Sequence, residues 1–127
     1  MILKKKIEII PNNKGNIIKY INKKNNFLKK IKEVYFTEVK KGHIKGWIKH
    51  TKTKCFLLPV KGKVKFYYSK DLKKKRTIIL DSHKPLGILV NPGTWFAFES
   101  LERCSLLINS IEIYHNPKET IKHQIEF

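Results

Sequence analysis

The sequence has 127 residues and a formal net charge of +18, a length that fits one domain and excludes a two-domain enzyme. Hydrophobic residues make up 41% of the chain, which supplies a buried core and excludes a wholly disordered chain. No apolar run approaches the ~18 residues of a spanning helix, and the first residues do not resemble a signal peptide. We therefore expect a single domain over residues 1–127, cytoplasmic and without membrane attachment.

Short runs of β-branched and aromatic residues, separated by Gly, Pro, Asn and Lys clusters, predict ten β-strands. In chain order the predicted strands are 7–10, 17–21, 31–37, 43–50, 54–60, 64–69, 76–80, 86–90, 94–100 and 105–114. Residues 25–30 and 117–124 are predicted to hold helical turns. About ten short strands are typical of an all-β sandwich or barrel.

The alternation of side chains along each predicted strand separates the inner from the outer face. In strand 43–50, His50 falls on the more apolar face, whereas Lys45 and Trp47 fall on the opposite face. Single polar groups among apolar neighbours are typical of a binding cavity in a small barrel. The candidate cavity residues found in this way are His50, Tyr68 and Asn109.

The cysteines and histidines do not form a metal-binding pattern. Cys55 and Cys104 each stand in an apolar context and are interpreted as reduced, buried residues. The five histidines are scattered along the chain, without the close pairing of zinc or iron sites. We therefore expect no metal and no other cofactor.

Five short segments, in this order and with these gaps, resemble a known family. They are KGNI at 14–17, IKEVYF at 31–36, GHIKGWIKH at 42–50, VKGKV at 60–64 and VNPGTWFAF at 90–98. The chain resembles the cupin-type nucleotide-sugar epimerases and ketoisomerases, that is, the dTDP-4-dehydrorhamnose 3,5-epimerase and dTDP-4-keto-6-deoxyglucose 3,4-ketoisomerase group, over residues 7–120. The resemblance implies a cupin jelly roll, or double-stranded β-helix, and a homodimer that exchanges an N-terminal strand. It also implies an isomerase of cell-surface polysaccharide biosynthesis whose partner is a nucleotide-linked sugar.

The motif that carries the family's chemistry is only partly present. Lys45 and Gly46 stand where the family has Arg-Gly, and Ile48 replaces the histidine that serves as the usual base. His50 occupies the second polar position of that motif, while Phe96 replaces a histidine of the epimerases. The resemblance therefore leaves two alternatives, an enzyme that works through His50 or a member that has lost the chemistry.

Further roles follow from the resemblance and from the chemistry of proton transfer. The candidate acids that complement the histidine base are Tyr35, Tyr68 and Tyr114. Lys14 and Lys45 occupy positions that bind the nucleotide diphosphate in the family, although lysine supplies a point charge where arginine supplies a fork. Cys55 falls near a further substrate-binding position. No match to the C-terminal aspartate of the epimerases is found, and no acidic residue lies on the strands of the cavity face.

The charge supports a different hypothesis. Residues 1–54 carry a net charge of +13 and residues 55–127 one of +5, and such a field favours polyanions. The aromatic run at 65–68 is similar to a stacking strand of single-strand binders. Because the lysines are dispersed and the polar groups are predicted to face inward, nucleic acid is the less favoured partner. The hypotheses are thus a nucleotide-sugar isomerase or epimerase, a catalytically silent sugar-binding cupin, and a basic nucleic-acid-binding barrel.

Overall fold

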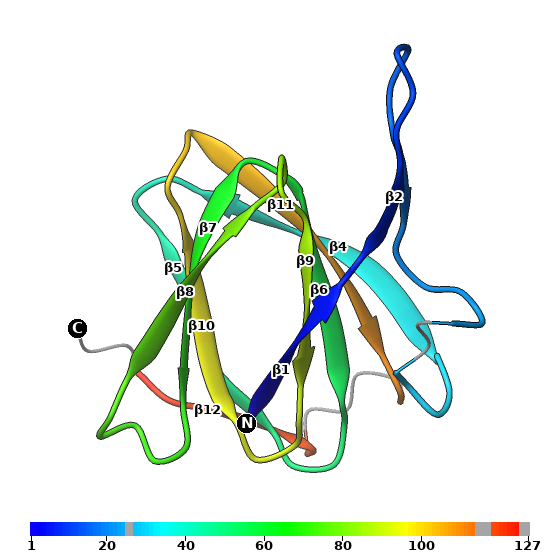
Figure 1. Ribbon diagram of the computed structural model, residues 1–127. Helices are drawn as coiled ribbons and strands as arrows, with labels where there is room; N and C mark the ends of the chain where they lie inside the picture. The colour runs from blue at the N-terminus through cyan, green and yellow to red at the C-terminus, as the bar shows by residue number, and fades with distance from the viewer. Residues whose placement is uncertain (25–26, 114–117, 125–127) are drawn as a thin grey trace.

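The chain folds as two five-stranded antiparallel sheets that face each other (Figure 1), with a separate two-stranded hairpin beside them. This computed structural model describes residues 1–24, 27–113 and 118–124. The first sheet has the order β1-β9-β6-β11-β4. Its strands are β1 (Ile2–Lys6), β9 (Leu86–Val90), β6 (Cys55–Lys61), β11 (Cys104–Ile111) and β4 (Glu33–Lys40).

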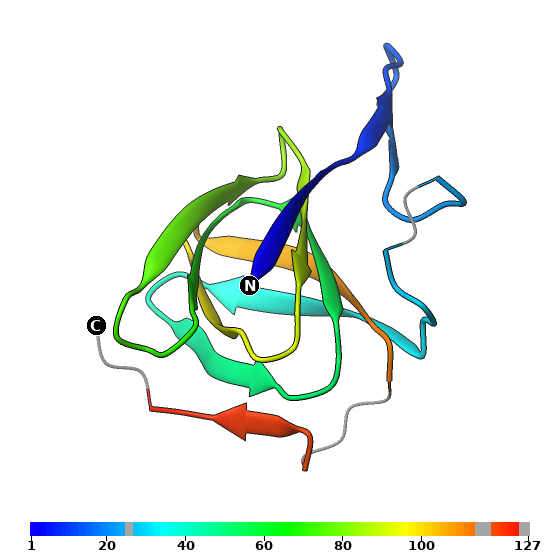
Figure 2. The same cartoon turned by 60° about the horizontal axis from the view of Figure 1, so that its bottom comes forward.

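The second sheet has the order β12-β5-β10-β7-β8 and closes the other side of the barrel. Its strands are β12 (Thr120–Lys122), β5 (Ile44–His50), β10 (Trp95–Ser100), β7 (Lys63–Ser69) and β8 (Arg76–Asp81). The hairpin pairs β2 (Glu8–Ile10) with β3 (Ile17–Lys19). Figure 2 shows the ring of strands from below, with β12 alongside β5 at the rim. The predicted all-β jelly roll is confirmed, and each of the ten predicted strands has a counterpart.

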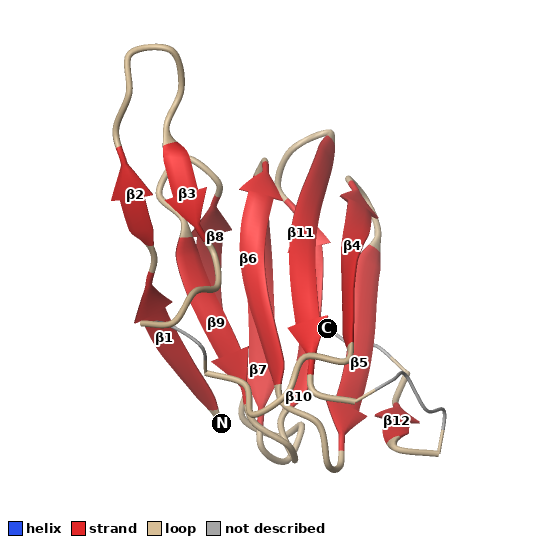
Figure 3. Cartoon of the chain, turned by 90° about the vertical axis from the view of Figure 1, so that its right-hand side faces the viewer, coloured by secondary structure: helices blue, strands red, loops and turns tan. Residues whose placement is uncertain are grey.

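Both predicted helical turns are wrong where the structure describes them. Residues 27–30 contain no helix, and residues 25, 26 and 117 lie outside the described residues. The segment from Thr120 to Lys122 is β12, which pairs with β5 through Thr120↔His50, as suits the β-branched Thr120 and Ile121. The described residues form no helix (Figure 3), so none of their segments is a membrane-spanning helix.

Strand β1 was not predicted, because three of its five residues are lysines, Lys4 to Lys6. It lies at the edge of the first sheet and pairs only with β9 there. Lysine on an edge strand opposes pairing with further strands. The lysine run is therefore compatible with a strand at the edge, whereas it would be unusual in the centre of a sheet.

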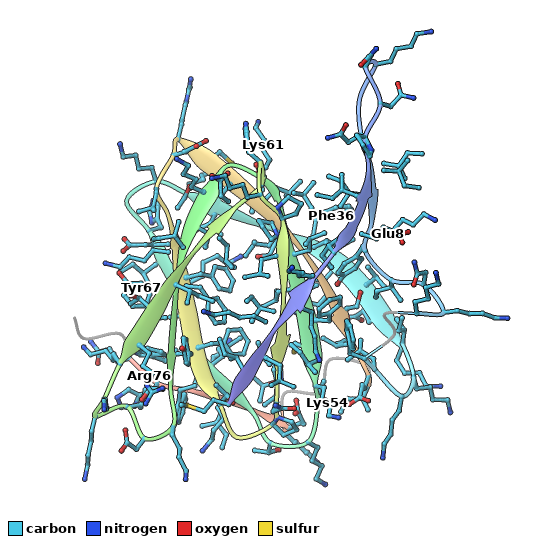
Figure 4. All side chains as sticks on the ribbon, in the orientation of Figure 1. Glu8, Phe36, Lys54, Lys61, Tyr67 and Arg76 are labelled. Carbon is cyan, nitrogen blue, oxygen red and sulfur yellow. The ribbon has the colours of Figure 1, made fainter. Side chains whose placement is uncertain are left out.

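The space between the sheets holds the main hydrophobic core, which Figure 4 shows filled with side chains. The inward positions of β7, β10 and β11 belong to this core, since Phe66, Phe96 and Leu107 are at most 2% exposed. A second cluster lies on the outer face of the first sheet. There Tyr20 stacks on Phe56 with ring centroids 5.2 Å apart. The segment that follows β3 thus covers part of this sheet.

Candidate active site

A cavity of about 480 Å³ opens between the sheets, on the side formed by β4, β5, β10, β11 and β12. One wall is apolar and consists of Ile48, Leu57, Phe96 and Phe98. The polar lining residues are Tyr35, Thr37, His50, Asn109 and Thr120, and the exposed rim carries Lys45, Lys122 and His123. The cavity thus combines an apolar interior with a few polar groups, as small-molecule sites do.

His50 and Glu119 form a buried pair at the edge of this cavity. The Nδ1 atom of His50 lies 2.9 Å from Oε2 of Glu119, and each side chain is 6% exposed. Thr120 Oγ1 lies 3.2 Å from the same Nδ1 atom. Because the carboxylate is an acceptor, it fixes the hydrogen on Nδ1 and leaves the Nε2 lone pair available.

Hydrogen bonds to the 51–53 loop hold the Glu119 carboxylate in place. Oε1 accepts the backbone N–H groups of Lys52 at 2.9 Å and of Thr53 at 3.0 Å. Burial alone would raise the pKa of Glu119, but the Lys52 N–H, the His50 ring and the Thr53 N–H together lower it to about 2. Glu119 is therefore an anion at neutral pH and can stabilise a positive charge on His50.

The other ring nitrogen of His50, Nε2, is buried and accepts or donates no hydrogen bond within the described residues. Buried polar atoms are nearly always paired, so an unpaired one in a cavity wall indicates a functional role. A lone pair held in this way is what a general base needs. The geometry therefore makes Nε2 of His50 a candidate general base.

Tyr35 and Asn109 form the opposite polar group of the lining. They face each other across β4 and β11, and Asn109 Nδ2 donates to Tyr35 Oη at 2.9 Å. Burial, and to a smaller extent the neighbouring Cys55 and Glu33, raise the pKa of Tyr35, although the Asn109 hydrogen bond opposes this. The phenol is therefore neutral at physiological pH, a state in which it can donate a hydrogen bond.

The alternation predicted for β5 fails at a bulge opposite β10. The register shifts between Phe96 and Ala97, so that Phe96 pairs with Ile48 and Ala97 with Gly46. A bulge re-aims the side chains beside it, and Lys45 consequently lines the cavity together with His50. The Trp47 ring instead packs with Tyr67 and Ala97 in a separate cluster, on the face that alternation predicts. A Cβ at Gly46, whose φ is +111°, would lie 2.6 Å from Phe96 O, which explains why this position holds glycine.

Lys45 lies at the cavity rim, where its ammonium group is held by β4. Nζ donates to Thr37 Oγ1 at 2.6 Å and to the Glu38 carbonyl at 3.2 Å. Lys122 of β12 also lines the rim. Two exposed cations beside one opening can attract an anionic group of a ligand.

The structure does not bring the remaining sequence candidates to this cavity. Cys55 is fully buried in the core and outside the lining, and burial raises the pKa of its thiol to about 12. Tyr68 packs against the same core and is not a lining residue. Lys14 lies in the turn of the β2–β3 hairpin, which Figure 1 shows projecting away from the barrel. Tyr114 lies outside the described residues.

Sequence reasoning missed Glu119, because residues 117–124 were expected to form a helical turn rather than a strand beside β5. The signal that could have found it is the single acidic residue directly before the β-branched pair Thr120-Ile121. A strand that pairs with the end of β5 would place that acid next to His50. Among the described residues, no group of three His, Cys, Asp or Glu side chains could hold a metal ion.

Comparisons with known proteins agree with this fold. A family model described as FdtA: WxcM-like, C-terminal, matches residues 3–127. No curated protein matches the chain significantly.

Among solved structures, a dTDP sugar isomerase from Desulfovibrio desulfuricans G20 has a TM-score of 0.87 and 16% identity, over 97% of this chain and 83% of that one. QdtA, a sugar 3,4-ketoisomerase from Thermoanaerobacterium thermosaccharolyticum in complex with TDP, has a TM-score of 0.85 and 21% identity, over 96% and 88% of the two chains. The RmlC epimerase of Mycobacterium tuberculosis has a TM-score of 0.82 and 14% identity, over 95% and 68%. At these identities the likeness shows a shared fold.

Proposed function

The chain belongs to the FdtA family, described as WxcM-like, C-terminal, and from that premise we propose that it is a nucleotide-sugar isomerase or epimerase. It transfers a proton next to the ketone of a 4-keto-6-deoxy sugar nucleotide. The observation that carries the proposal is the buried His50–Glu119 pair, which leaves Nε2 of His50 unpaired in the wall of the cavity. The similar QdtA structure is a complex with TDP, which supports a nucleotide-linked ligand. We expect the enzyme to act in the cytoplasm, in the biosynthesis of cell-surface polysaccharide.

The chemical step needs only the groups already described. Nε2 of His50 accepts the proton from the carbon next to the ketone. The electron pair of that C–H bond forms a C=C bond, and the π pair of the ketone moves to its oxygen, which gives an enolate. The Glu119 carboxylate stabilises the resulting imidazolium through Nδ1–H. The imidazolium then returns its proton to carbon, so that His50 is regenerated.

The rim cations suit the nucleotide diphosphate. Lys45 and Lys122 lie at the opening of a cavity large enough for a sugar. A diphosphate held at the rim would leave the sugar inside, beside His50. Hydrogen bonds to Thr37 and Glu38 hold the ammonium group of Lys45, so this group is already in position before the ligand binds.

A homodimer would also explain the projecting hairpin. Ile9, Ile10, Ile17 and Ile18 are each 38–56% exposed on β2 and β3, and apolar surface of this kind marks an interaction site. We expect two copies to associate through these hairpins. Light scattering should give twice the monomer mass for the wild type and the monomer mass for Ile18→Glu. The equally apolar, 53% exposed Ile79 of β8 provides the control, since Ile79→Glu should leave the dimer intact.

The function is tested by replacing the base. His50→Asn should bind TDP and fold normally, and it should incorporate solvent deuterium into a 4-keto-6-deoxy sugar nucleotide at a rate lower by ~10²-fold or more. His83, whose side chain is 81% exposed, gives the control variant His83→Asn, which should exchange at the wild-type rate. Equal rates in His50→Asn and the wild type would show that another group is the base.

A silent cupin is the second candidate, and one observation favours it. Ile48 and Phe96 form part of the apolar wall at positions where the family has histidine. If wild-type protein binds TDP but exchanges no deuterium into dTDP-, CDP- or GDP-linked 4-keto sugars, this second function replaces the first. Tight, salt-sensitive binding of single-stranded DNA without affinity for any nucleotide diphosphate would instead support the nucleic-acid hypothesis.

A further inference from the structure

The last strand of the second sheet forms part of the cavity wall. Strand β12 stands at the edge of this sheet and pairs only with β5 among the described strands, as Figure 2 shows at the margin of the barrel. It brings Thr120, Lys122 and the following His123 to the cavity lining. Separation of β12 from β5 would therefore take these three side chains out of the wall and widen the opening.

Little apolar surface holds this strand on the barrel. Within residues 118–124 only Glu119 is buried, and Ile121, the one large apolar side chain of this segment, is 41% exposed. Segments with few buried apolar contacts open locally at a lower free energy than the whole domain unfolds. Residues 118–124 therefore have the properties of a segment that can leave and rejoin the barrel while the core stays folded.

The contacts that hold the segment converge on Glu119. Its backbone carbonyl accepts the N–H of Thr51 at 3.1 Å. Its carboxylate accepts two further N–H groups of the 51–53 loop and contacts the ring of His50. The side chain that holds the segment is thus the one that orients the base, so docking of β12 and assembly of the His50–Glu119 pair are a single event.

On the basis of the proposed function, we infer that residues 118–124 form a strap that opens to admit the nucleotide sugar and closes over it. Closure places Glu119 beside His50, so the base is complete only when the cavity is covered. While His50 holds the proton taken from the sugar, its contact with Glu119 joins a cation to an anion and is strongest. The strap therefore stays closed while the sugar is an enolate, and it opens more readily once the proton has returned to carbon.

Amide hydrogen exchange tests whether the strap opens. Two amides report its attachment, namely Thr51 N–H, bonded to the Glu119 carbonyl, and His123 N–H, which donates to the Trp47 carbonyl at 2.9 Å. Their protection factors should be lower by about tenfold or more than those of the β6–β11 ladder, and TDP should raise them. Protection of Thr51 and His123 equal to that of the core ladder would overturn the inference, because the strap would then open only on global unfolding.

A reversible lock tests whether this opening is needed for the reaction. Ile121 and Lys49 are directly opposite in the β12–β5 register, and both lie outside the cavity lining. Opposite residues of antiparallel strands have Cα atoms about 4.5–5.5 Å apart, which a disulfide can span. The variant Lys49→Cys/Ile121→Cys is made in a Cys104→Ser background, which leaves the buried Cys55 as the only native thiol.

Oxidation of the lock should slow both TDP association and deuterium exchange into a 4-keto-6-deoxy sugar nucleotide by about tenfold or more, and dithiothreitol should restore both rates. The matched control is a disulfide at the other end of the same sheet, where Lys65 and Ile79 are directly opposite on β7 and β8 and outside the lining. Oxidised Lys65→Cys/Ile79→Cys should keep the rates of its reduced form, because it leaves the strap free to open.

The outcomes separate the strap from the proposed function. An oxidised β5–β12 lock that binds TDP and exchanges deuterium as fast as its reduced form overturns the strap and leaves the proposed isomerase intact. If the wild type binds TDP but exchanges no deuterium, the proposed function fails, and the effect of the lock on TDP association still decides whether the strap opens for the ligand. A wild type without affinity for TDP overturns both. Losses confined to the oxidised β5–β12 lock support both.

Discussion

The two sides of the barrel interior differ in how they are filled. On the side of β7, β8 and β9, inward side chains such as Phe66, Leu80 and Ile88 are at most 1% exposed and form continuous apolar packing. On the side of β4, β5 and β11, the inward positions instead surround a cavity of about 480 Å³ and include His50 and Asn109. The same jelly roll thus contains a closely packed core on one side and the candidate active-site cavity on the other.

The difference comes from side-chain chemistry and not from the backbone pattern. Strands on both sides alternate inward and outward residues, and β10 joins them, since Phe96 and Phe98 belong to the core and also line the cavity. Large apolar side chains close the space on the first side. Polar side chains on the second side cannot pack against one another without hydrogen-bond partners, which leaves room for a ligand to supply them.

The largest effect is expected from a cavity-creating change on the packed side. Phe66→Ala should lower the free energy of unfolding by about 3–5 kcal/mol, because a fully buried ring leaves a void. Ile48→Ala should cost about 1 kcal/mol, since this half-buried residue already borders the cavity and fewer contacts are lost. Urea denaturation of the two variants measures both values.

Similar losses of unfolding free energy in these two variants would contradict the contrast between the two sides of the barrel. They would mean that the cavity lining is packed as closely as the core. The outward Phe36 on β4, labelled in Figure 4, is 61% exposed and supplies the control for phenylalanine itself. Phe36→Ala should change the free energy of unfolding by less than either interior variant.

Most of the fold could be predicted from the sequence, because period-two alternation and turn residues are local signals. The inward faces around Phe66 and Leu107 follow from alternation alone. The bulge opposite Gly46 could not be predicted, since it depends on the pairing of β5 with β10, and it brings Lys45 to the cavity against the predicted alternation.

The site could be predicted only in part, for a related reason. Its members His50, Tyr35 and Asn109 are polar residues on apolar strands and are visible in the sequence. Glu119 became a partner of His50 only through the pairing of β12 with β5, a contact between residues 69 positions apart. Lys14, by contrast, is a candidate through the resemblance alone, and it lies in the projecting hairpin rather than at the cavity of its own chain.

The next largest effect concerns the carboxylate that supports the site. The pKa of Glu119 is lowered from 4.5 to about 2 in the folded chain, so its ionised form contributes stability above pH 4.5 that is lost as the pH falls toward 2. The shift corresponds to at most about 3 kcal/mol. Glu119→Gln should therefore be less stable than the wild type at pH 7, and the difference should shrink between pH 4.5 and pH 2. Urea denaturation across this range measures it.

Glu112 offers a matched control on a different loop. Its carboxylate also accepts backbone N–H groups, those of Lys29 at 2.9 Å and Lys54 at 3.3 Å, but it does not line the cavity. Glu112→Gln should leave deuterium exchange near the wild-type rate, whereas Glu119→Gln should slow it by disturbing the His50 tautomer. Equal rates of deuterium exchange in the two variants would show that Glu119 only holds the 51–53 loop in place and does not support His50.

The smallest effect belongs to the rim, where solvent screens every charge. Lys45→Ala should weaken TDP binding by about two- to fivefold at low salt, as expected for one exposed charge worth up to about 1 kcal/mol. The loss should diminish toward 0.3 M salt, where the screening length is about 6 Å. Lys63→Ala removes the same charge from an exposed residue outside the cavity lining and therefore controls for the net charge of +18. If both variants lose affinity equally, the nucleotide is attracted by the net positive charge of the whole protein. A loss confined to Lys45→Ala shows that the attraction comes from the rim of the cavity.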